Sequence, residues 1–142
     1  MEKVCIDTDV LIEYLREEKS ESAKAILMLK KSNTKLAVSS ITVYELFVGP
    51  LWLKRTEELQ RLKELKTWLI ELPLDQSAAE LAAEMDTRLK REGKEIGLRD
   101  TFIAAICIVN GYSLLTKNVK HFKRVSEYWD LEVLTPKDVI SM

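Results

Sequence analysis

A short apolar segment near the N-terminus passes without a loop into acidic residues and then into a helical pattern. Val4, Cys5 and Ile6 form the apolar segment, Asp7-Thr8-Asp9 follows at once, and apolar side chains with helical spacing begin at Val10. A short apolar run between polar residues indicates a strand that is buried on both faces. In open α/β sheets, ligands bind in the crevice beyond the carboxyl ends of such strands. The opening of the chain therefore predicts a buried strand that carries Asp7 to the functional edge of a sheet.

The rest of the chain continues this alternation of short strands and helical segments. Few of its turns carry hairpin signals, which favours a parallel sheet with helices on both faces. The sequence contains no internal repeat, low-complexity segment or linker. We therefore expect one α/β domain over residues 1–142, with strands at residues 3–6, 36–38, 70–74, 113–116 and 131–134.

Two helical segments in the middle of the chain bear on packing. The first, residues 41–48, is expected to end at Gly49-Pro50, because these residues commonly close a helix. The second, residues 51–68, is long and amphipathic, with leucines at helical spacing. We expect Trp52 and the apolar face of this second segment to lie in the core, with an interface to another chain as the alternative.

Size and charge limit the classes of function. A length of 142 residues fits one domain, and 46% hydrophobic with 32% charged residues is the composition of a globular protein. The formal net charge is −1, so no overall basic field attracts a polyanion. Binding to nucleic acid would therefore require a local basic patch or metal ions.

The cysteines and the N-terminus indicate the compartment. Cys5 and Cys107 lie in apolar runs without the spacing of a zinc site or a disulfide framework, so we expect buried free thiols. The N-terminus lacks the pattern of a signal peptide, and no apolar run reaches the ~18 residues of a membrane span. We therefore expect a cytoplasmic protein that is not membrane-bound.

Three acidic residues stand out by their positions. Asp7 ends the first strand, Glu45 interrupts an almost wholly apolar helical segment, and Asp100 opens the most apolar helix of the chain. Burying an isolated carboxylate costs several kcal/mol, so each must be neutralised, paired or metal-bound. Asp7 and Asp100 can instead serve as helix N-caps. Glu45 has no basic residue within one helical turn, but an ion pair with Arg99 is an alternative.

If the three acids converge, they suit a hard divalent cation. Mg²⁺ and Mn²⁺ prefer oxygen ligands, and Mg²⁺ retains several waters, so a few carboxylates suffice. No histidine or cysteine lies beside these acids in the sequence, which disfavours zinc. One or two such ions suit the hydrolysis of a phosphodiester, because they activate water and stabilise the leaving oxygen.

Four segments together resemble a known family. Residues 7–12 (DTDVLI), 40–46 (SITVYEL), 98–105 (LRDTFIAA) and 114–122 (LLTKNVKHF) resemble, in order, the motifs of the PIN domain. The resemblance is to the VapC-type toxins of bacterial and archaeal toxin–antitoxin pairs. It implies a three-layer α/β/α sandwich with a central, mostly parallel sheet. It also implies a magnesium- or manganese-dependent endoribonuclease that forms a homodimer or higher oligomer and is inhibited by a cognate antitoxin protein.

The resemblance also assigns residues to the site. The acids that match the family's metal ligands are Asp7, Glu45 and Asp100. A fourth acid is common after the fourth strand, but this chain has Asn118 there, and His121 stands where an acid often precedes the phenylalanine. Asn118 can offer a carbonyl oxygen, and Asp9 can supply the missing charge, so both are candidate ligands.

Basic residues after the expected fourth strand are candidates for binding RNA. Their charge could hold phosphates, although a solvated basic turn has the same composition. We assign no catalytic role to His121, because a metal-activated water needs no such base. Thr116 could orient a phosphate or a metal-bound water, or could cap the turn that follows. The candidate substrate-binding residues are Thr116, Lys117, Lys120 and Arg124, with His121 and Lys123 nearby.

Two other functions compete with the nuclease. A PIN-like interaction module with weak or no catalysis would explain the missing fourth acid, although it would have no need of the remaining three. A haloacid-dehalogenase-type phosphatase would use Asp7 as nucleophile and Asp9 as general acid. That family also requires a later lysine and a paired acidic motif, and neither is evident.

Overall fold

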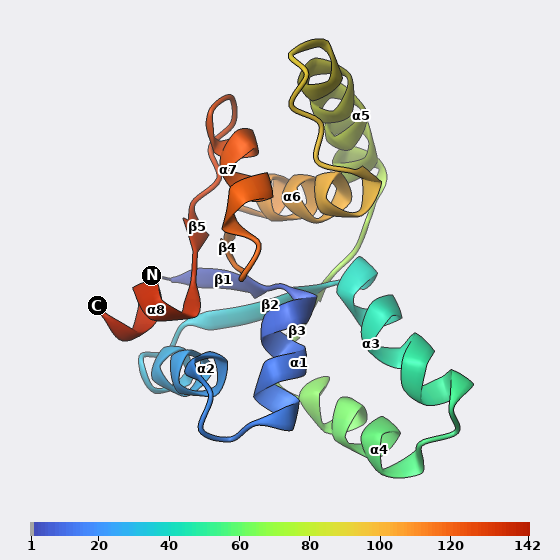
Figure 1. Ribbon diagram of the computed structural model, residues 1–142, viewed down its shortest axis with the longest axis vertical. Helices are drawn as coiled ribbons and strands as arrows, with labels where there is room; N and C mark the ends of the chain where they lie inside the picture. The colour runs from blue at the N-terminus through green and yellow to red at the C-terminus, as the bar shows by residue number, and fades with distance from the viewer. Residues whose placement is uncertain (1) are drawn as a thin grey trace.

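Residues 2–142, which the computed structural model describes, form a central five-stranded sheet flanked by helices (Figure 1). The strand order is β3-β2-β1-β4-β5, and every pairing between these described strands is parallel. The expected parallel sheet is therefore confirmed. The strands are β1 (Lys3–Ile6), β2 (Lys35–Ser39), β3 (Ile70–Leu72), β4 (Ser113–Leu115) and β5 (Val133–Leu134).

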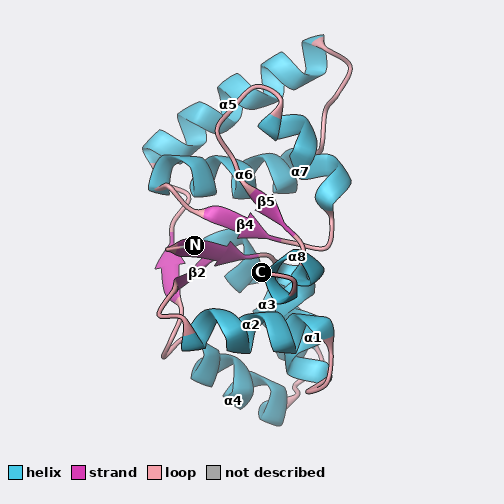
Figure 2. Cartoon of the chain, turned by 90° about the vertical axis from the view of Figure 1, so that its left-hand side faces the viewer, coloured by secondary structure: helices cyan, strands magenta, loops and turns pink. Residues whose placement is uncertain are grey.

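Helices cover both faces of this sheet (Figure 2), which confirms the three-layer α/β/α architecture. One face carries α5 (Gln76–Arg91), α6 (Leu98–Asn110) and α7 (Val119–Ser126). The other side of the molecule carries α1 (Thr8–Arg16), α2 (Glu21–Lys31), α3 (Ser40–Trp52), α4 (Thr56–Leu65) and α8 (Pro136–Ile140).

Successive side chains of the strands pack into two separate apolar layers, one on each face of the sheet. In β1, Cys5 packs with the helices α5 and α6, whereas Val4 and Ile6 pack with α1 and α2 on the opposite face. This division follows from the two-residue period of a strand, which sends successive side chains to opposite faces. Both faces of β1 are therefore buried, as its continuous apolar sequence predicts.

Helix α3 does not end where the sequence predicts. It continues through Gly49-Pro50 to Trp52, and the chain turns only at Lys54, whose φ angle is 55°. A proline within a helix removes its own N–H donor, but its carbonyl can still accept a bond, and the Arg55 N–H donates to the Pro50 carbonyl at 2.9 Å. The predicted segment 51–68 is therefore split between the end of α3, the separate helix α4 and the turn after it.

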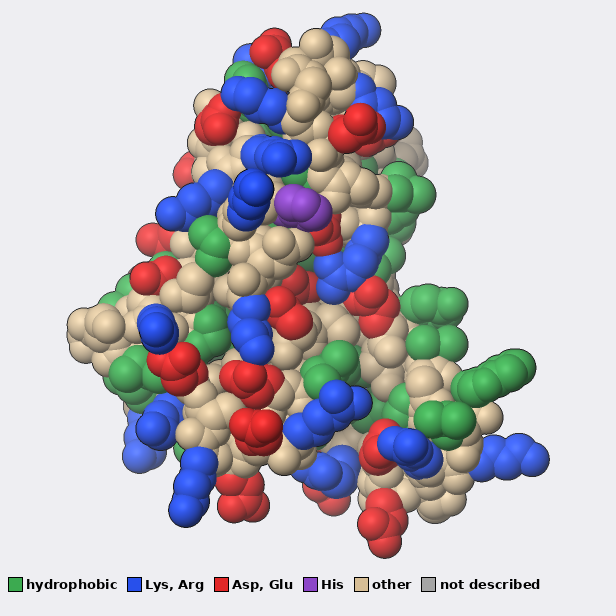
Figure 3. Space-filling view, viewed as in Figure 1, with side chains coloured by type: hydrophobic (Ala, Val, Ile, Leu, Met, Phe, Trp, Pro, Cys, Tyr) green, Lys and Arg blue, Asp and Glu red, His purple; other side chains and the backbone are tan. Residues whose placement is uncertain are grey.

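The predicted burial of segment 51–68 is correct for only part of it. Leu62 and Leu65 of α4 are buried, as the helical spacing predicts. Trp52 at the end of α3 is 84% exposed, and its neighbours Leu51 and Leu53 are also exposed, so the core assignment of Trp52 was wrong. Figure 3 shows hydrophobic side chains projecting from the molecule over the region of α3. Among residues 2–142, no helix combines the length and apolar character that crossing a bilayer requires.

The strand order determines where a site can form. Strand β1 is paired with β2 on one side and with β4 on the other, so the chain leaves β1 in both directions across the sheet. Such a reversal of strand order opens a crevice at the carboxyl ends of the strands. Residues that follow β1, β2 and β4 therefore meet at this edge.

A candidate acidic active site at the carboxyl edge of the sheet

Asp7 is held at the centre of this edge by its two neighbouring elements. Its backbone N–H donates to the Leu115 carbonyl of β4 at 2.9 Å, which extends the β1–β4 pairing by one residue. Its carboxylate caps α1 by accepting from the Thr8 N–H at 2.8 Å. The Thr116 hydroxyl donates to the other carboxylate oxygen at 2.7 Å. Asp7 is thus buried, caps α1 and also faces the site, so its capping role and a ligand role are compatible.

Glu45 reaches the same edge from α3. Ser39, at the end of β2, caps this helix by accepting from the Thr42 N–H at 3.1 Å, which sets the direction in which α3 leaves the sheet. The Thr8 hydroxyl donates to the Glu45 carboxylate at 2.6 Å and also contacts the Thr42 hydroxyl at 3.0 Å. These buried threonine hydroxyls fix Glu45 close to Asp7.

Asp100 lies in the first turn of α6, which excludes the alternative in which Asp100 is the N-cap of this helix. The N-cap of α6 is Gly97, whose φ of 92° suits only glycine, so α6 begins three residues earlier than the apolar run and places Asp100 within its first turn. The Asp100 carboxylate accepts from the Asn118 side-chain amide at 3.1 Å and contacts the His121 Nδ1 at 3.0 Å. Asp100 is buried and held from the α7 side.

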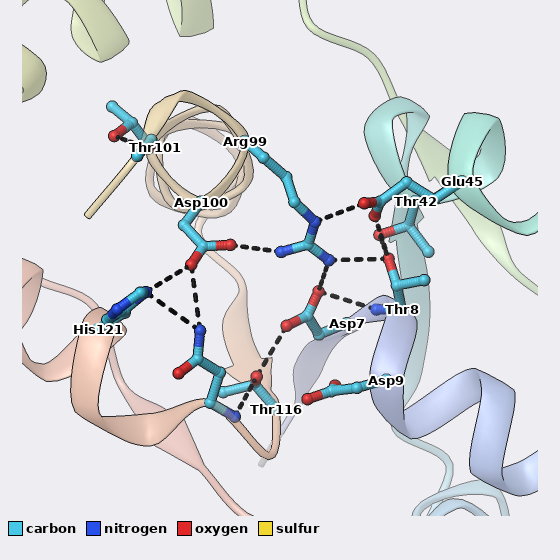
Figure 4. A network of polar contacts seen from close by, with 12 residues as sticks. Asp7, Thr8, Asp9, Thr42, Glu45, Arg99, Asp100, Thr101, Thr116 and His121 are labelled. Atoms are coloured by element: carbon cyan, nitrogen blue, oxygen red, sulfur yellow. Dashed lines mark hydrogen bonds and ion pairs between the residues drawn. The ribbon is translucent and has the colours of Figure 1, made fainter.

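The guanidinium of Arg99 lies between the three carboxylates (Figure 4). Its Nε donates to Glu45 at 2.6 Å, its Nη2 donates to Asp7 at 3.0 Å, and its Nη1 donates to Asp100. The Nη2 also donates to the Thr8 hydroxyl at 3.1 Å. The alternative of an ion pair between Glu45 and Arg99 is thus confirmed, and the pair extends to both aspartates.

These contacts shift the pKa of two of the charged groups. Burial alone would raise the pKa of the Glu45 carboxyl, but the hydrogen bonds from Arg99 and Thr8 outweigh it, and the net pKa is lowered. Burial likewise opposes the charge of Arg99, yet its bond to Glu45 and the charges of all three acids raise the pKa of the guanidinium. Each partner therefore keeps the other ionised.

Asp9 and Asn118 lie beside the three acids, and each is held by hydrogen bonds other than those of Arg99. Asp9 accepts from the Lys117 N–H at 3.1 Å and from the Val10 N–H at 2.8 Å. Burial and then the charge of Asp7 raise the pKa of its carboxyl. Asn118 turns its amide nitrogen, rather than its carbonyl oxygen, toward Asp100. Both residues border the site, and their role as ligands remains a prediction.

The candidate substrate-binding residues differ in burial, because Thr116 is buried and the three basic residues are not. Thr116 is buried, and its hydroxyl serves Asp7 while accepting from the Asn118 N–H at 3.0 Å. Thr116 therefore caps the turn that follows β4, and its contact with a phosphate or a metal-bound water stays a prediction. Lys117 pairs with Glu13 at 2.8 Å, and Arg124 donates to the Glu95 carbonyl at 3.0 Å. Lys120 is exposed on α7.

The basic side chains and the acidic cluster occupy neighbouring areas of one face. In Figure 3, lysine and arginine side chains gather beside the only histidine, His121 in purple, and acidic side chains lie below it. His121 contacts Asp100, so the basic group borders the acidic site. A substrate phosphate at the acids would therefore have positive charge next to it.

The donor set fits a hard divalent cation by its chemistry. Asp7, Glu45 and Asp100 present only oxygen atoms, and these already surround one positive group. Within residues 2–142, no three acidic, histidine or cysteine side chains lie close enough together to hold one ion directly. Mg²⁺ needs only one or two carboxylates and keeps several waters, so this spacing is compatible with it.

Sequence reasoning found the three acids but missed two residues of the site. Arg99 was considered only as a partner of Glu45, and no role in the site was given to Thr8. The signal for Thr8 was its place directly after Asp7, where a buried hydroxyl needs partners. The signal for Arg99 was its position beside Asp100, at the start of a helix otherwise apolar on most sides.

The fold and the site define a parallel α/β protein with an acidic cluster at the switch point of its sheet. The PIN domain family matches residues 4–128. The chain is 30% identical over 132 residues to Ribonuclease VapC2 of Rickettsia felis, covering 88% of this chain and 96% of that protein. It is 30% identical over 126 residues to Ribonuclease VapC1 of Methanocaldococcus jannaschii, covering 89% and 83%. The chain therefore belongs to the PIN-domain family, among the VapC ribonucleases.

A solved structure agrees with this membership and confirms the predicted fold. The crystal structure of VapBC2 from Rickettsia felis, bound to a DNA fragment from its promoter, contains a chain that matches with a TM-score of 0.78 and 25% identity. The match covers 93% of this chain and 97% of that chain. Membership in the PIN-domain family replaces the phosphatase interpretation of Asp7-Thr8-Asp9.

Proposed function

We propose that this protein is a metal-dependent endoribonuclease of the VapC type that hydrolyses RNA phosphodiesters. The observation that carries this proposal is that Asp7, Glu45 and Asp100, from three separate elements, all contact the Arg99 guanidinium at the edge of the sheet. The names of the curated relatives, Ribonuclease VapC1 and VapC2, support the reaction.

The residues of the site have distinct tasks in this proposal. Asp7, Asp100 and Glu45 would hold Mg²⁺ or Mn²⁺, which when bound supplies an acidified water and neutralises phosphate charge. Thr116 and the Thr8 N–H keep Asp7 oriented, so that its carboxylate does not rotate away. Asn118 and His121 hold Asp100 in the same way from α7. Preorganised carboxylates lower the cost of binding a cation, because little reorientation is needed.

Substrate binding is assigned to the basic side chains near α7. Lys120 is exposed there, and Lys117 and Arg124 flank it with side chains that surface partners hold weakly. Phosphate contacts by such residues are independent of base identity and weaken with salt. We propose that they bind the RNA backbone on either side of the scissile phosphate.

The protein's setting follows from the same proposal. Structures similar to this chain are VapBC toxin–antitoxin complexes, so we propose a cognate antitoxin as partner and a homodimer or higher oligomer as the assembly. The exposed apolar side chains at the end of α3 suit a protein interface. The buried free thiols of Cys5 and Cys107 suit the reducing cytoplasm. We also propose that residues 1–142 form one domain, since one sheet organises both apolar layers.

Cleavage of a mixed RNA panel tests the proposed reaction. With Mg²⁺ or Mn²⁺ we expect cleavage that EDTA abolishes, and we expect Asp7→Asn to lose about a hundredfold or more in rate, because a cation ligand is removed. The matched control is Asp86→Asn, which removes a surface acid paired with Lys90 and should leave the rate unchanged. Cleavage that persists in EDTA would contradict the metal mechanism.

A non-catalytic interaction module is the second candidate function. Arg99 favours it, because its guanidinium already supplies the acids with a counter-charge. In that case calorimetry would detect no binding of Mn²⁺, and the RNA panel would remain intact with every cation. Metal-dependent cleavage would exclude this candidate.

A further inference from the structure

Arg99 makes a contact pattern that an ordinary surface ion pair does not show. One guanidinium uses three different nitrogens on three carboxylates, which come from the end of β1, from α3 and from α6. The side chain of Arg99 is 37% exposed, whereas those of Asp7, Asp100 and Glu45 are 2%, 8% and 28% exposed. The acids thus lie deeper than the cation that joins them, and Arg99 closes the cluster from the solvent side.

The cluster needs a positive charge in order to be stable. Buried carboxylates without a partner are costly, and like charges at close range add repulsion. The Thr8, Thr116 and Asn118 groups donate hydrogen bonds to these acids but carry no charge. Arg99 therefore supplies the compensating charge in this arrangement, because its guanidinium donates to all three acids.

A divalent cation requires the same oxygen atoms. Mg²⁺ binds carboxylate oxygens at about 2.0–2.1 Å. Arg99 already contacts such oxygens, with its Nε 2.6 Å from a Glu45 oxygen and its Nη2 3.0 Å from an Asp7 oxygen. A guanidinium and a metal ion cannot occupy the space between these carboxylates together. Their charges also repel each other at such distances.

We propose that Arg99 is an internal counter-ion that competes with the divalent cation for the acidic cluster, so that the cation binds only as the guanidinium leaves. This inference rests on the proposed function, since it concerns the cation of that same site. The long, part-exposed side chain can turn toward solvent without moving α6, because its backbone is fixed in the first turn of the helix. Arg99 thereby lowers the affinity of the site for metal and stabilises the protein when metal is scarce.

Binding of Mn²⁺ to variants of Arg99 tests the proposal by calorimetry, without any measurement of activity. We expect Arg99→Gln to bind Mn²⁺ about tenfold more tightly than the unmodified protein, because the competitor is gone. Arg99→Lys keeps the charge but loses the planar fork that reaches three carboxylates, so its affinity should lie between the two. The matched control is Arg55→Gln, which removes the same charge from a surface pair with Glu58 and should change nothing.

Thermal unfolding supplies the second measurement. In EDTA, Arg99→Gln should have a lower Tm than the unmodified protein. Saturating Mn²⁺ should raise the Tm of the variant by more than the Tm of the unmodified protein, so that the two Tm values approach each other. If the glutamine variant does not fold in EDTA, Arg99→Lys carries both measurements. A stable Arg99→Gln whose Tm in EDTA equals that of the unmodified protein would overturn the counter-ion role.

The outcomes separate this inference from the function on which it rests. If the unmodified protein binds Mn²⁺ and neither Arg99 variant binds it more tightly, the competition is overturned while the nuclease proposal stands. If Arg99→Lys binds as the unmodified protein does and only the glutamine variant gains affinity, the effect is one of net charge, and displacement is overturned. If no variant binds Mn²⁺ and EDTA leaves RNA cleavage intact, both proposals fail.

Discussion

Thr8 shows how a single hydroxyl can organise a site. It donates to Glu45 and lies within hydrogen-bond distance of the Thr42 hydroxyl and the Arg99 Nη2. The hydroxyl accepts from Arg99, and its single proton is within reach of both Glu45 and Thr42. The backbone N–H of the same residue donates to Asp7. Thr8 therefore links two of the three acids, although its own side chain carries no charge.

The ion pair of Glu45 predicts a dependence of stability on pH. The folded-state pKa of Glu45 is lowered, so its charged form stabilises the fold above the unfolded-state pKa of about 4.3, and this contribution is lost as the pH falls through the folded pKa. In EDTA, Glu45→Gln should therefore be less stable than the unmodified protein at pH 7, and the difference should shrink below about pH 4.3. Urea unfolding at a series of pH values measures it.

Glu80→Gln is the matched control for this measurement. Glu80 accepts from the Gln76 side chain on the surface of α5. We expect no comparable difference for this variant. A Glu45→Gln difference that grows as the pH falls would contradict the assigned direction of the pKa shift.

At the scale of elements, the start of α6 decides how Arg99 and Asp100 are presented. Gly97 precedes the helix with a φ of 92°, and a Cβ at this position would meet no atom of residues 2–142 within 4 Å apart from its two chain neighbours. The only obstacle to a side chain is therefore backbone strain, which costs about 1–3 kcal/mol for a non-glycine residue in such a region. Relief of that strain would move the first turn of α6.

We accordingly expect Gly97→Ala to lower both stability and the affinity for Mn²⁺. The loss of stability should be about 1–3 kcal/mol in urea unfolding, and calorimetry should show weaker metal binding, because Asp100 shifts with the turn. Gly93→Ala is the matched control, since Gly93 has a φ of 69° with open space around it but lies beyond the end of α5. It should lose stability while binding Mn²⁺ normally. Equal metal binding by both variants would contradict the role given to Gly97.

The elements that sequence reasoning predicted well are those with strong local signals. Strand β1 follows from its short apolar run, and the burial of Leu62 and Leu65 follows from the helical spacing of the leucines. Local signals failed at Pro50, because a proline removes one bond and the rest of the helix can continue. They also failed at Gly97, because the start of α6 is set by a backbone conformation that leaves no mark in the hydrophobic pattern.

At the scale of the whole molecule, the order of strands and acids was readable and their contacts were not. Alternating elements predict a parallel sheet, and acids after its strands predict a shared edge, so the meeting of Asp7, Glu45 and Asp100 could be expected. Which strand neighbours β1 is not encoded in any local pattern. The position of the Arg99 side chain depends on that arrangement, since its partner Asp7 is 92 residues away.

The exposed end of α3 predicts self-association. Val48, Leu51, Trp52 and Leu53 are all exposed there, and contiguous apolar side chains on a surface commonly mark an interface. We expect sedimentation velocity to show an oligomer that dissociates on dilution, and Trp52→Glu to shift it toward the monomer without lowering the Tm, because Trp52 packs little within its own chain.

Leu27→Glu is the control for this experiment. Leu27 is an exposed apolar residue of α2, away from the end of α3, and its replacement should leave the oligomer intact. A Trp52→Glu protein that sediments as the unmodified protein does would exclude the end of α3 as the interface.

The position of β4 in the sheet has a consequence for synthesis of the chain on the ribosome. Strand β1 is made first, but one of its two neighbours, β4, and the counter-charge of Asp7 on Arg99 come from the last third of the chain. Until β4 and Arg99 have been made, one edge of β1 is unpaired, and Asp7 and Glu45 lack the guanidinium that balances their charge. The site is therefore complete only after residues 99–115 have been made, so that a shorter growing chain carries no finished site that could act on RNA.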